Sequence, residues 1–185
     1  YGDHTVEKDE GPREPDIEKI KSLQAAFIEN GTITAATSSP ISIGASAILI
    51  TSDNYAKQNG IKIRAEVLSR AVAGVEWTHM GKGPLPATEK ALKKAELTLD
   101  DINAIELNEA FAAQSLYVIR EGGWDMDKVN FNGGAIALGK PLGCSGTQII
   151  TTIIDVLEQN DVSCGLDTMC IGSGQGIAKV IQRPS

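Results

Sequence analysis

The sequence predicts an α/β protein in which a mixed sheet carries helices on its faces. Three observations lead to this prediction. Between residues 62 and 182, apolar runs of strand length alternate with longer segments of helical periodicity. A glycine-rich segment at 130–146 comes directly before an apolar helical stretch, and two strand-like runs around a glycine turn close the chain. The resulting order, β-α-β-α-β-α-β-β, is typical of a sheet covered by helices.

Composition narrows the class of protein. The 185 residues are 42% hydrophobic, which is enough for one or two ordinary cores. The net charge of -7 argues against a nucleic-acid-binding protein, and no apolar run is long enough to form a transmembrane segment. Three cysteines, an odd number in a chain of this size, indicate reduced thiols and an intracellular setting. Their spacings, and those of His4 and His79, match no zinc pattern, so no metal site is expected.

The first 60 residues predict a few short elements. Residues 1–15 are polar and indicate a surface loop. Asp16 is a candidate N-cap for a helix with one apolar face that ends at Asn30 and Gly31. The remaining elements expected here are a strand at 32–34, a loop at 36–44, a buried strand at 45–51 and a short helix through 55–58.

The rest of the chain predicts the alternation of strands and helices. The first strand is expected at 62–72, and its inward-facing side chains are expected to be those of Ile63, Ala65, Val67 and Leu68. A helix at 109–121 is expected to bury one face, formed by Phe111, Ala112, Ser115, Leu116 and Ile119. The other expected elements are helices at 87–95 and 147–157, a helical turn at 99–101 capped by Asp100 or Asp101, and strands at 104–107, 129–131, 165–170 and 176–182.

The glycine-rich segment allows two interpretations. Its glycines permit tight turns and close approach of a ligand or another backbone. They open onto the N-terminus of a helix, where free N–H groups and the helix dipole favour an anion or a developing oxyanion. The alternative is a tight loop that is packed for structural reasons. The residues alone favour neither; the five glycines are Gly133, Gly134, Gly139, Gly143 and Gly146.

Three segments, taken in order, resemble the C-terminal half of thiolases: 107–111 (LNEAF), 130–146 (NFNGGAIALGKPLGCSG) and 169–176 (MCIGSGQG). The resemblance covers 15–184 and is nearest to the degradative branch that acts in fatty-acid β-oxidation; the related ketoacyl synthases share the fold but not these motifs. It implies a layered α-β-α-β-α fold with mixed five-stranded sheets. Residues 1–60 would be the end of the N-terminal unit and 61–185 the C-terminal unit, with the nucleophilic cysteine outside the chain.

This resemblance also implies an activity and partners. A thiolase is an acyltransferase that cleaves 3-ketoacyl-CoA with CoA to acetyl-CoA and a shortened acyl-CoA, or condenses two acetyl-CoA. Coenzyme A and acyl-CoA come as substrates, and no permanently bound cofactor is expected. Thiolase subunits form homodimers or tetramers, and degradative ones assemble with a hydratase/dehydrogenase subunit. A bacterial-type, cytoplasmic location is expected, and organelle targeting stays open because the chain does not begin with Met.

Family roles fall on individual residues of this chain. Cys170 corresponds to the acid/base cysteine, Gly172 to a backbone N–H donor of an oxyanion hole, and Asn108 to the asparagine that fixes a water facing the thioester oxygen. Ser39 matches the serine that contacts the pantetheine arm of CoA. Three of these residues have a purely structural alternative: Cys170 as a buried apolar residue, Asn108 as a helix N-cap and Ser39 as part of a serine–proline turn. Glu109 is expected to brace the loop, Cys144 and Cys164 to pack, and His79 to lie on the surface.

Two positions depart from the family pattern. Lys140 stands where the family has the histidine of Gly-His-Pro, and Ile43 stands where it has aspartate. A histidine exchanges protons near neutral pH, whereas a lysine keeps its proton unless burial lowers its pKa, although an ammonium can still stabilise a thiolate or an oxyanion. Three hypotheses follow: a thiolase impaired at this step, an inactive relative that serves as a CoA-binding or complex-assembly module, or an error in the recorded sequence.

Overall fold

The computed structural model describes all residues except 1, 4, 6, 9–10 and 185, so His4 and four other positions of the surface loop expected at 1–15 lie outside the described residues. The main body is a four-stranded sheet in the order β2 (Glu66–Gly74), β6 (Gln175–Gln182), β5 (Cys164–Ile171) and β3 (Ala104–Leu107). β6 is antiparallel to both neighbours, whereas β5 and β3 are parallel. The prediction of a mixed sheet is therefore confirmed.

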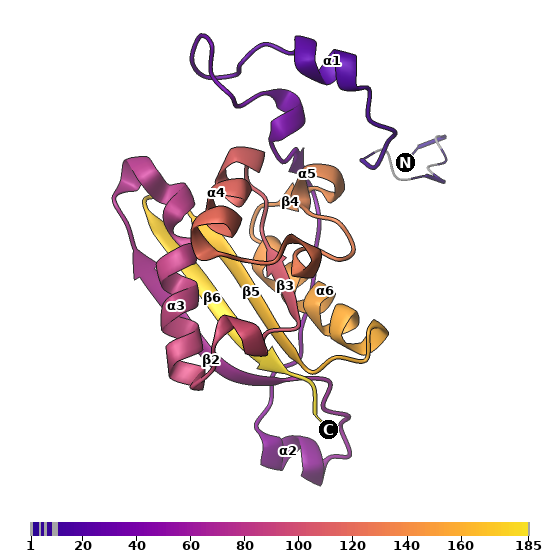
Figure 1. Ribbon diagram of the computed structural model, residues 1–185. Coiled ribbons are helices and arrows are strands. Elements are labelled where there is room, and N and C mark those ends of the chain that lie inside the picture. Colours follow the sequence, from indigo (N-terminus) through magenta and orange to yellow (C-terminus); the bar gives the residue numbers. More distant parts are fainter. Residues whose placement is uncertain (1, 4, 6, 9–10, 185) are drawn as a thin grey trace.

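Helices cover both faces of this sheet (Figure 1). α3 (Pro84–Ala95) and α4 (Ala112–Gly122) pack on one face, over a core whose buried members include Ile105, Leu166 and Val180. α6 (Ser145–Gln159) packs on the other face with Ala104 and Ile181. Because successive strand residues point to opposite faces, each strand supplies both cores.

A fifth strand was expected at 129–131, but the chain there forms only a single bridge between Val129 and Ile105. Asn130 explains the difference. Its φ of +53° turns the backbone away from the sheet, and its side chain takes over the pairing with Leu107. The Asn130 carboxamide accepts from the Leu107 N–H at 2.8 Å and donates to the Leu107 carbonyl at 3.0 Å. A side chain therefore forms the hydrogen bonds with the edge of β3 that the backbone of a fifth strand was predicted to form.

The short elements complete the chain. They are α1 (Ile17–Ser22), η1 (Ala35–Thr37), β1 (Ile41–Ser42), α2 (Asp53–Gln58), η2 (Trp77–Lys82), η3 (Leu99–Asp101), η4 (Met126–Lys128), α5 (Ala135–Leu138) and β4 (Lys140–Pro141). Figure 1 shows the segment with α1 beyond one end of the sheet and α2 beyond the other.

The N-terminal predictions are partly wrong. Asp16 caps α1 as expected, through the Lys19 N–H at 3.0 Å, but the helix ends at Ser22 instead of continuing to residue 30. The Ala26 N–H donates to the Ile33 carbonyl at 2.8 Å, a contact that a continuous helix would not allow. The strand predicted at 32–34 is not formed.

Residues 45–51 do not form the buried strand that was predicted. Leu49 and Ile50 are 75% and 81% exposed, and no described strand pairs with this segment. A strand needs a neighbour for its backbone N–H and C=O groups, and sequence pattern alone does not supply one.

Two predictions of which side chains face the core are also wrong. In β2 the buried positions are Ser69, Ala71 and Ala73, whereas Val67 and Leu68 are exposed. A register shift between Val67 and Ser69 accounts for this, because a bulge redirects the side chains that precede it. α4 begins at Ala112 and not at 109, and it buries Val118 in place of the exposed Leu116.

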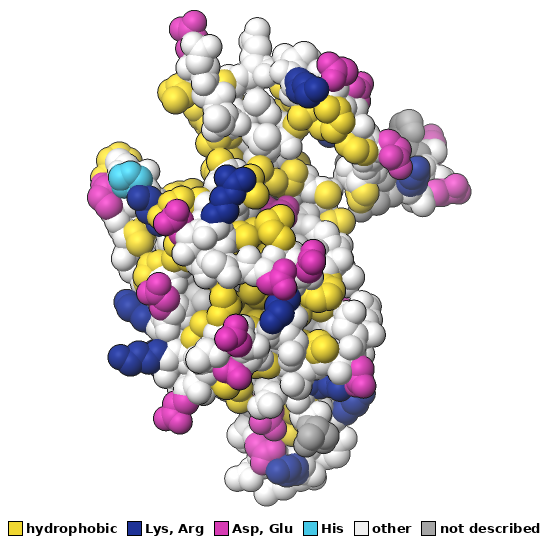
Figure 2. Space-filling model, viewed as in Figure 1, with side chains coloured by type: hydrophobic (Ala, Val, Ile, Leu, Met, Phe, Trp, Pro, Cys, Tyr) yellow, Lys and Arg dark blue, Asp and Glu magenta, His cyan; other side chains and the backbone are white. Residues whose placement is uncertain are grey.

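The remaining elements agree with expectation to within a few residues, including β3, β5, β6, α2, α3 and α6. At η3, the Asp101 carboxylate accepts from the Thr98 N–H at 2.8 Å, so Asp101 caps the turn from within it. On the face drawn in Figure 2, basic and acidic side chains are interspersed. In the described part of the chain, no helix is long and apolar enough to cross a membrane.

Candidate active site

Four segments distant in sequence meet near the carboxyl ends of β3 and β5. The Asn108 N–H donates to the Thr168 carbonyl at 3.0 Å, which joins the end of β3 to β5. Ser39 donates from its N–H to the Ala110 carbonyl at 3.1 Å. β1 pairs in parallel with β4, with Ile41 opposite Lys140. The expected site residues Ser39, Asn108, Lys140 and Cys170 therefore lie on segments that are in contact or on adjacent strands.

Cys170 lies near the end of β5, opposite Gly176 of β6, and is only 4% exposed. Its sulfur is a free thiol. Burial raises the pKa of the Cys170 thiol, and the positive charge of Lys140 acts in the opposite direction. The thiol is thus held neutral by its surroundings while a cation stands close enough to favour the thiolate.

The turn after Cys170 leaves open space at Gly172. No described atom lies within 4 Å of the position that a Cβ of Gly172 would occupy. A group can therefore approach this backbone without steric obstruction, as an oxyanion-hole donor requires.

Asn108 is 3% exposed, and its Oδ1 has no hydrogen-bond partner among the described residues. The alternative of a helix N-cap is wrong, because the N-cap of α4 is Phe111. A buried carboxamide oxygen without a partner is rare in native proteins and calls for an ordered water or a ligand.

Glu109 braces the glycine-rich loop, as the sequence predicted. Its carboxylate accepts from Asn130 Nδ2 at 2.9 Å and from the Ile136 N–H at 3.1 Å. A Cβ on Gly134 would overlap this carboxylate, so only glycine fits there. The contact joins the segment after β3 to the loop that leads to Lys140.

Lys140 is half-buried and follows Gly139, whose φ is +99°. A Cβ on Gly139 would lie 2.7 Å from Ser42 Oγ, so this glycine lets β1 and β4 approach. Next to β1, Ile43 is fully exposed, an unusual place for a large apolar side chain.

Ser39 lies on one of the segments that meet at this site and is half-buried. Its hydroxyl donates to the Ala110 carbonyl at 3.3 Å, the same oxygen that accepts from its own N–H. This serine therefore anchors the 36–44 loop to the segment that follows Asn108.

The other candidate residues behave as packing or surface groups. Cys144 and Cys164 are buried free thiols, in agreement with the prediction. The His79 side chain is 58% exposed and lies beside Glu76. Over the residues that the structure describes, no group of three or more His, Cys, Asp or Glu side chains could hold a metal ion.

Sequence reasoning missed two buried acids on the face of the sheet that α6 covers. Glu106 of β3 is opposite Asp167 of β5, and they are 4% and 0% exposed. Lys179 Nζ lies 2.7 Å from Asp167 Oδ1. Burial raises the pKa of Asp167 to about 6 although Lys179 opposes the rise. Burial, together with Glu109 and Asp167, raises the pKa of Glu106 to about 8. An acid inside a strand that is otherwise apolar was the available signal.

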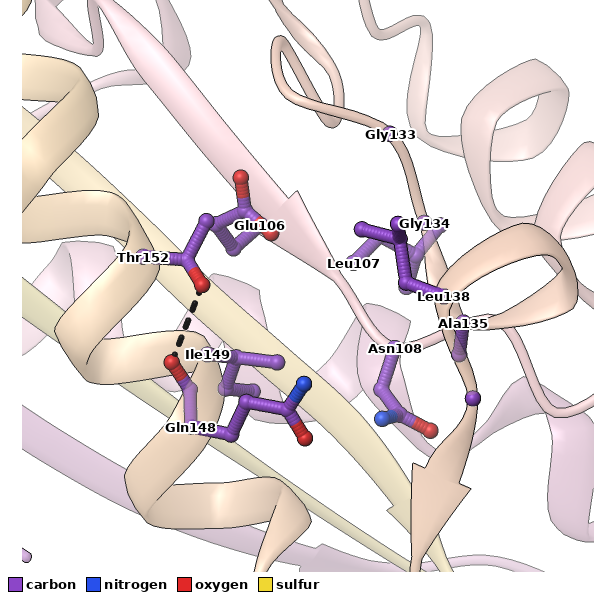
Figure 3. A pocket seen from close by; sticks show the side chains of 11 residues that line it. Glu106, Leu107, Asn108, Gly133, Gly134, Ala135, Leu138, Gln148, Ile149 and Thr152 are labelled. Carbon is purple, nitrogen blue, oxygen red and sulfur yellow. Dashed lines mark hydrogen bonds between the residues drawn. The ribbon is translucent and has the colours of Figure 1, made fainter. Parts of the chain in front are cut away.

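Glu106 and Asn108 line a small cavity between β3, the glycine-rich loop and α6 (Figure 3). Figure 3 shows Gln148, Ile149 and Thr152 of α6 on the opposite wall, with the Gln148 side chain extending toward Asn108. The cavity volume is about 30 Å³.

Comparison with known proteins shows the family of the chain. The family model described as "Thiolase, C-terminal domain" matches residues 61–183, and "Thiolase, N-terminal domain" matches 1–54. The chain is 56% identical over 174 residues to a 3-ketoacyl-CoA thiolase of Photobacterium profundum, covering 92% of this chain and 45% of that protein. It is 54% identical over 185 residues to a 3-ketoacyl-CoA thiolase of Vibrio cholerae, covering 97% and 48%.

Solved structures show the same fold. The acetyl-CoA acetyltransferase of Bacillus anthracis superposes with a TM-score of 0.93 at 38% identity, over 96% of this chain and 45% of that one. Human mitochondrial 3-ketoacyl-CoA thiolase in complex with CoA gives a TM-score of 0.89 at 36% identity, over 97% and 46%. The chain thus spans about half the length of the relatives that it matches.

Proposed function

The chain belongs to the thiolase family, and from this premise we propose that the protein of which it forms part is an acetyl-CoA C-acyltransferase. Its reaction would be cleavage of a 3-ketoacyl-CoA by CoA to acetyl-CoA and a shortened acyl-CoA, or the reverse condensation. The observation that carries the proposal is the convergence of Cys170, Lys140 and Asn108 at one end of the sheet. Since the chain spans about half of its relatives, a part outside it would supply the nucleophilic thiolate.

In this proposal Cys170 is the acid/base group. The nucleophilic thiolate forms a thioester with C3 as the bond between C2 and C3 breaks; the electron pair stays on C2, and the Cys170 thiol donates a proton to it. In the condensing direction the thiolate removes the C2 proton. Burial raises the pKa of this thiol, which suits a group that must hold a proton until the carbanion forms.

Gly172 and Asn108 would stabilise the oxygens that gain negative charge. The open space at Gly172 allows an oxyanion to approach its backbone N–H. Asn108 would hold a water that faces the thioester oxygen. Ser39, on the loop anchored at Ala110, would contact the pantetheine arm of CoA, which enters as a substrate and not as a resident cofactor.

Lys140 would act as a fixed cation in this site. Its ammonium can stabilise a thiolate and donate to an oxyanion, but it shuttles protons poorly at neutral pH. We therefore expect the step that deprotonates the nucleophile to be slow. The alternative, a catalytically inactive CoA-binding or assembly module, is favoured by Lys140 and Ile43 but not by the retained Cys170, Asn108 and Gly172.

The family background supports further proposals. We infer that residues 1–60 close the N-terminal thiolase unit and that 61–185 form the C-terminal unit. A homodimer or tetramer, association with a hydratase/dehydrogenase subunit, a role in fatty-acid degradation and a cytoplasmic location fit the bacterial relatives.

The test is thiolysis of acetoacetyl-CoA by the intact protein, compared with Cys170→Ala. Cys164→Ala is the matched control, because Cys164 is an equally buried thiol that begins the same strand, at the end opposite to Cys170, and packs in the α3 and α4 core. Activity should be lost with Cys170→Ala and kept with Cys164→Ala. Equal activity of the two variants would contradict the role of Cys170, and CoA binding without turnover in any form would favour the inactive module.

A further inference from the structure

The cavity beside Asn108 has the size and polarity of a water site. A buried water requires roughly 10–15 Å³ or more of such volume and two to four polar partners. This cavity has about 30 Å³, enough for one or two water molecules. Its wall combines the side chains of Glu106, Asn108 and Gln148 with the glycines of the loop.

Two buried polar atoms of this wall lack a partner. Glu106 Oε1 and Asn108 Oδ1 have no hydrogen-bond partner among the described residues, and both side chains are more than nine-tenths buried. Glu106 is in β3 and Asn108 directly follows this strand, two residues further along, and both side chains line the same cavity. A buried polar atom left unpaired costs about 1–3 kcal/mol, so such atoms are normally satisfied by ordered water.

From these observations we propose that the cavity holds a fixed water between Glu106 and Asn108, and that Glu106 is a positioning residue that orients the Asn108 carboxamide through this water. The inference about Asn108 rests on the proposed function, whereas the water site does not. This water is distinct from a substrate-facing one, because it lies between the sheet and α6.

The surroundings of Glu106 decide which hydrogen bonds it makes. Charged groups facing it are Glu109 from its own segment, Asp167 from β5 and, paired to Asp167, Lys179 from β6. The α6 residues that line the cavity, Gln148, Ile149 and Thr152, carry no charge. Burial and the two neighbouring acids raise the pKa of Glu106 to about 8, so it is a neutral O–H donor at pH 7.

A neutral Glu106 and an ionised one favour opposite orientations of Asn108. The neutral carboxyl donates to the water, which in turn donates to Asn108 Oδ1, so it favours the orientation of the carboxamide in which Oδ1 faces this water. The anion only accepts hydrogen bonds and attracts the Nδ2 donors of Asn108 instead. Protonated Glu106 therefore holds the amide in one orientation, and ionisation above pH 8 releases it.

Two measurements on the intact protein test the water site without reference to turnover. The first is a crystal structure, in which a water within hydrogen-bond distance of both Glu106 and Asn108 is expected. The second is the infrared carbonyl band of a protonated carboxyl at pH 7, which should disappear in Glu106→Gln. An empty cavity, or no band that depends on Glu106, would overturn the proposal.

Thiolysis then tests the positioning role. Glu106→Leu should lower kcat by about tenfold with KM nearly unchanged, as expected for one lost hydrogen bond. Glu106→Gln stays neutral and should keep its kcat above pH 8, where that of the parent falls. Thr151→Val is the matched control, because Thr151 does not line the cavity and its hydroxyl bonds within α6 to the Thr147 carbonyl.

Each outcome separates the two proposals. If Glu106→Gln and the parent lose kcat alike above pH 8, or if Glu106→Leu matches Thr151→Val, the positioning role is wrong. Absence of thiolysis in the parent protein would contradict the proposed function alone, and the crystal and infrared results would still decide the water site.

Discussion

Lys140 lies close enough to Cys170 for its positive charge to oppose the rise that burial causes in the pKa of the thiol. One residue comes from the loop before α6 and the other from β5, so the pairing arises only in the folded chain. It joins the residue that departs from the family pattern to the residue that would perform the acid/base step.

Replacing Lys140 by glutamine should raise the pKa of Cys170 further, because only the opposing charge is removed. We expect the alkylation of Cys170 to shift to higher pH, followed residue by residue with mass spectrometry. Cys164 is an internal control, since burial raises its pKa and Lys140 is not among the causes. An unchanged profile for Cys170 would show that the two groups do not interact.

The brace at Glu109 gives a prediction on stability. Glu109→Gln places an amide donor against Asn130 Nδ2 or the Ile136 N–H, both of which are donors. The free energy of unfolding in urea should fall by about 1–3 kcal/mol. The exposed Glu121→Gln, at the end of α4, is the control and should change it by less than about 0.5 kcal/mol. A small effect of Glu109→Gln would mean that the loop does not depend on this contact.

Glu106 should make the protein less stable as pH rises. Its pKa is about 8 in the folded state against 4.5 as the ordinary value, so the folded state binds the proton more tightly. The stabilisation is complete below pH 4.5 and is lost progressively up to about pH 8.

Glu106→Gln does not titrate, so its advantage in unfolding free energy over the parent should grow between pH 5 and pH 8, by about 3–4 kcal/mol. Urea unfolding at several pH values measures this difference. A difference that does not vary with pH would contradict the raised pKa.

Lys179→Met should destabilise the protein by about 3–5 kcal/mol at pH 8, because it leaves the buried Asp167 carboxylate without its partner. The pKa of Asp167 is about 6 with Lys179 present, and removal of the cation raises it further. The cost should therefore shrink at pH 5, where Asp167 is protonated. Lys93→Met, an exposed change on α3, controls for the loss of a lysine. An equal cost at both pH values would argue against ionised Asp167.

Much of the sheet could be predicted because its signals are local. β3, β5 and β6 are short apolar runs bounded by turn residues, and α6 has apolar residues at helical spacing after a glycine-rich loop. The segments that carry Asn108, Lys140 and Cys170 were recognisable from their motifs.

Other features depend on contacts that the sequence pattern does not contain. The segment 45–51 has strand-like residues but no described strand beside it. A register shift sets which side chains of β2 face the core. The Asn130 side chain forms the hydrogen bonds that a neighbouring strand was expected to make with the edge of β3. Glu106 and Asp167 lie 61 positions apart, and only the pairing of β3 with β5 places the two acids side by side.

The most direct test of the account compares thiolysis of acetoacetyl-CoA by the intact protein as it stands and with Lys140→His. Imidazole restores a group that exchanges protons near neutral pH, which contributes about 10²–10⁴-fold in rate. We expect the histidine form to be faster by at least the lower of these factors, with the fold and Cys170 unchanged. Equal rates for the two forms would contradict the account, because lysine would then be a competent base or the nucleophile would be activated by another group.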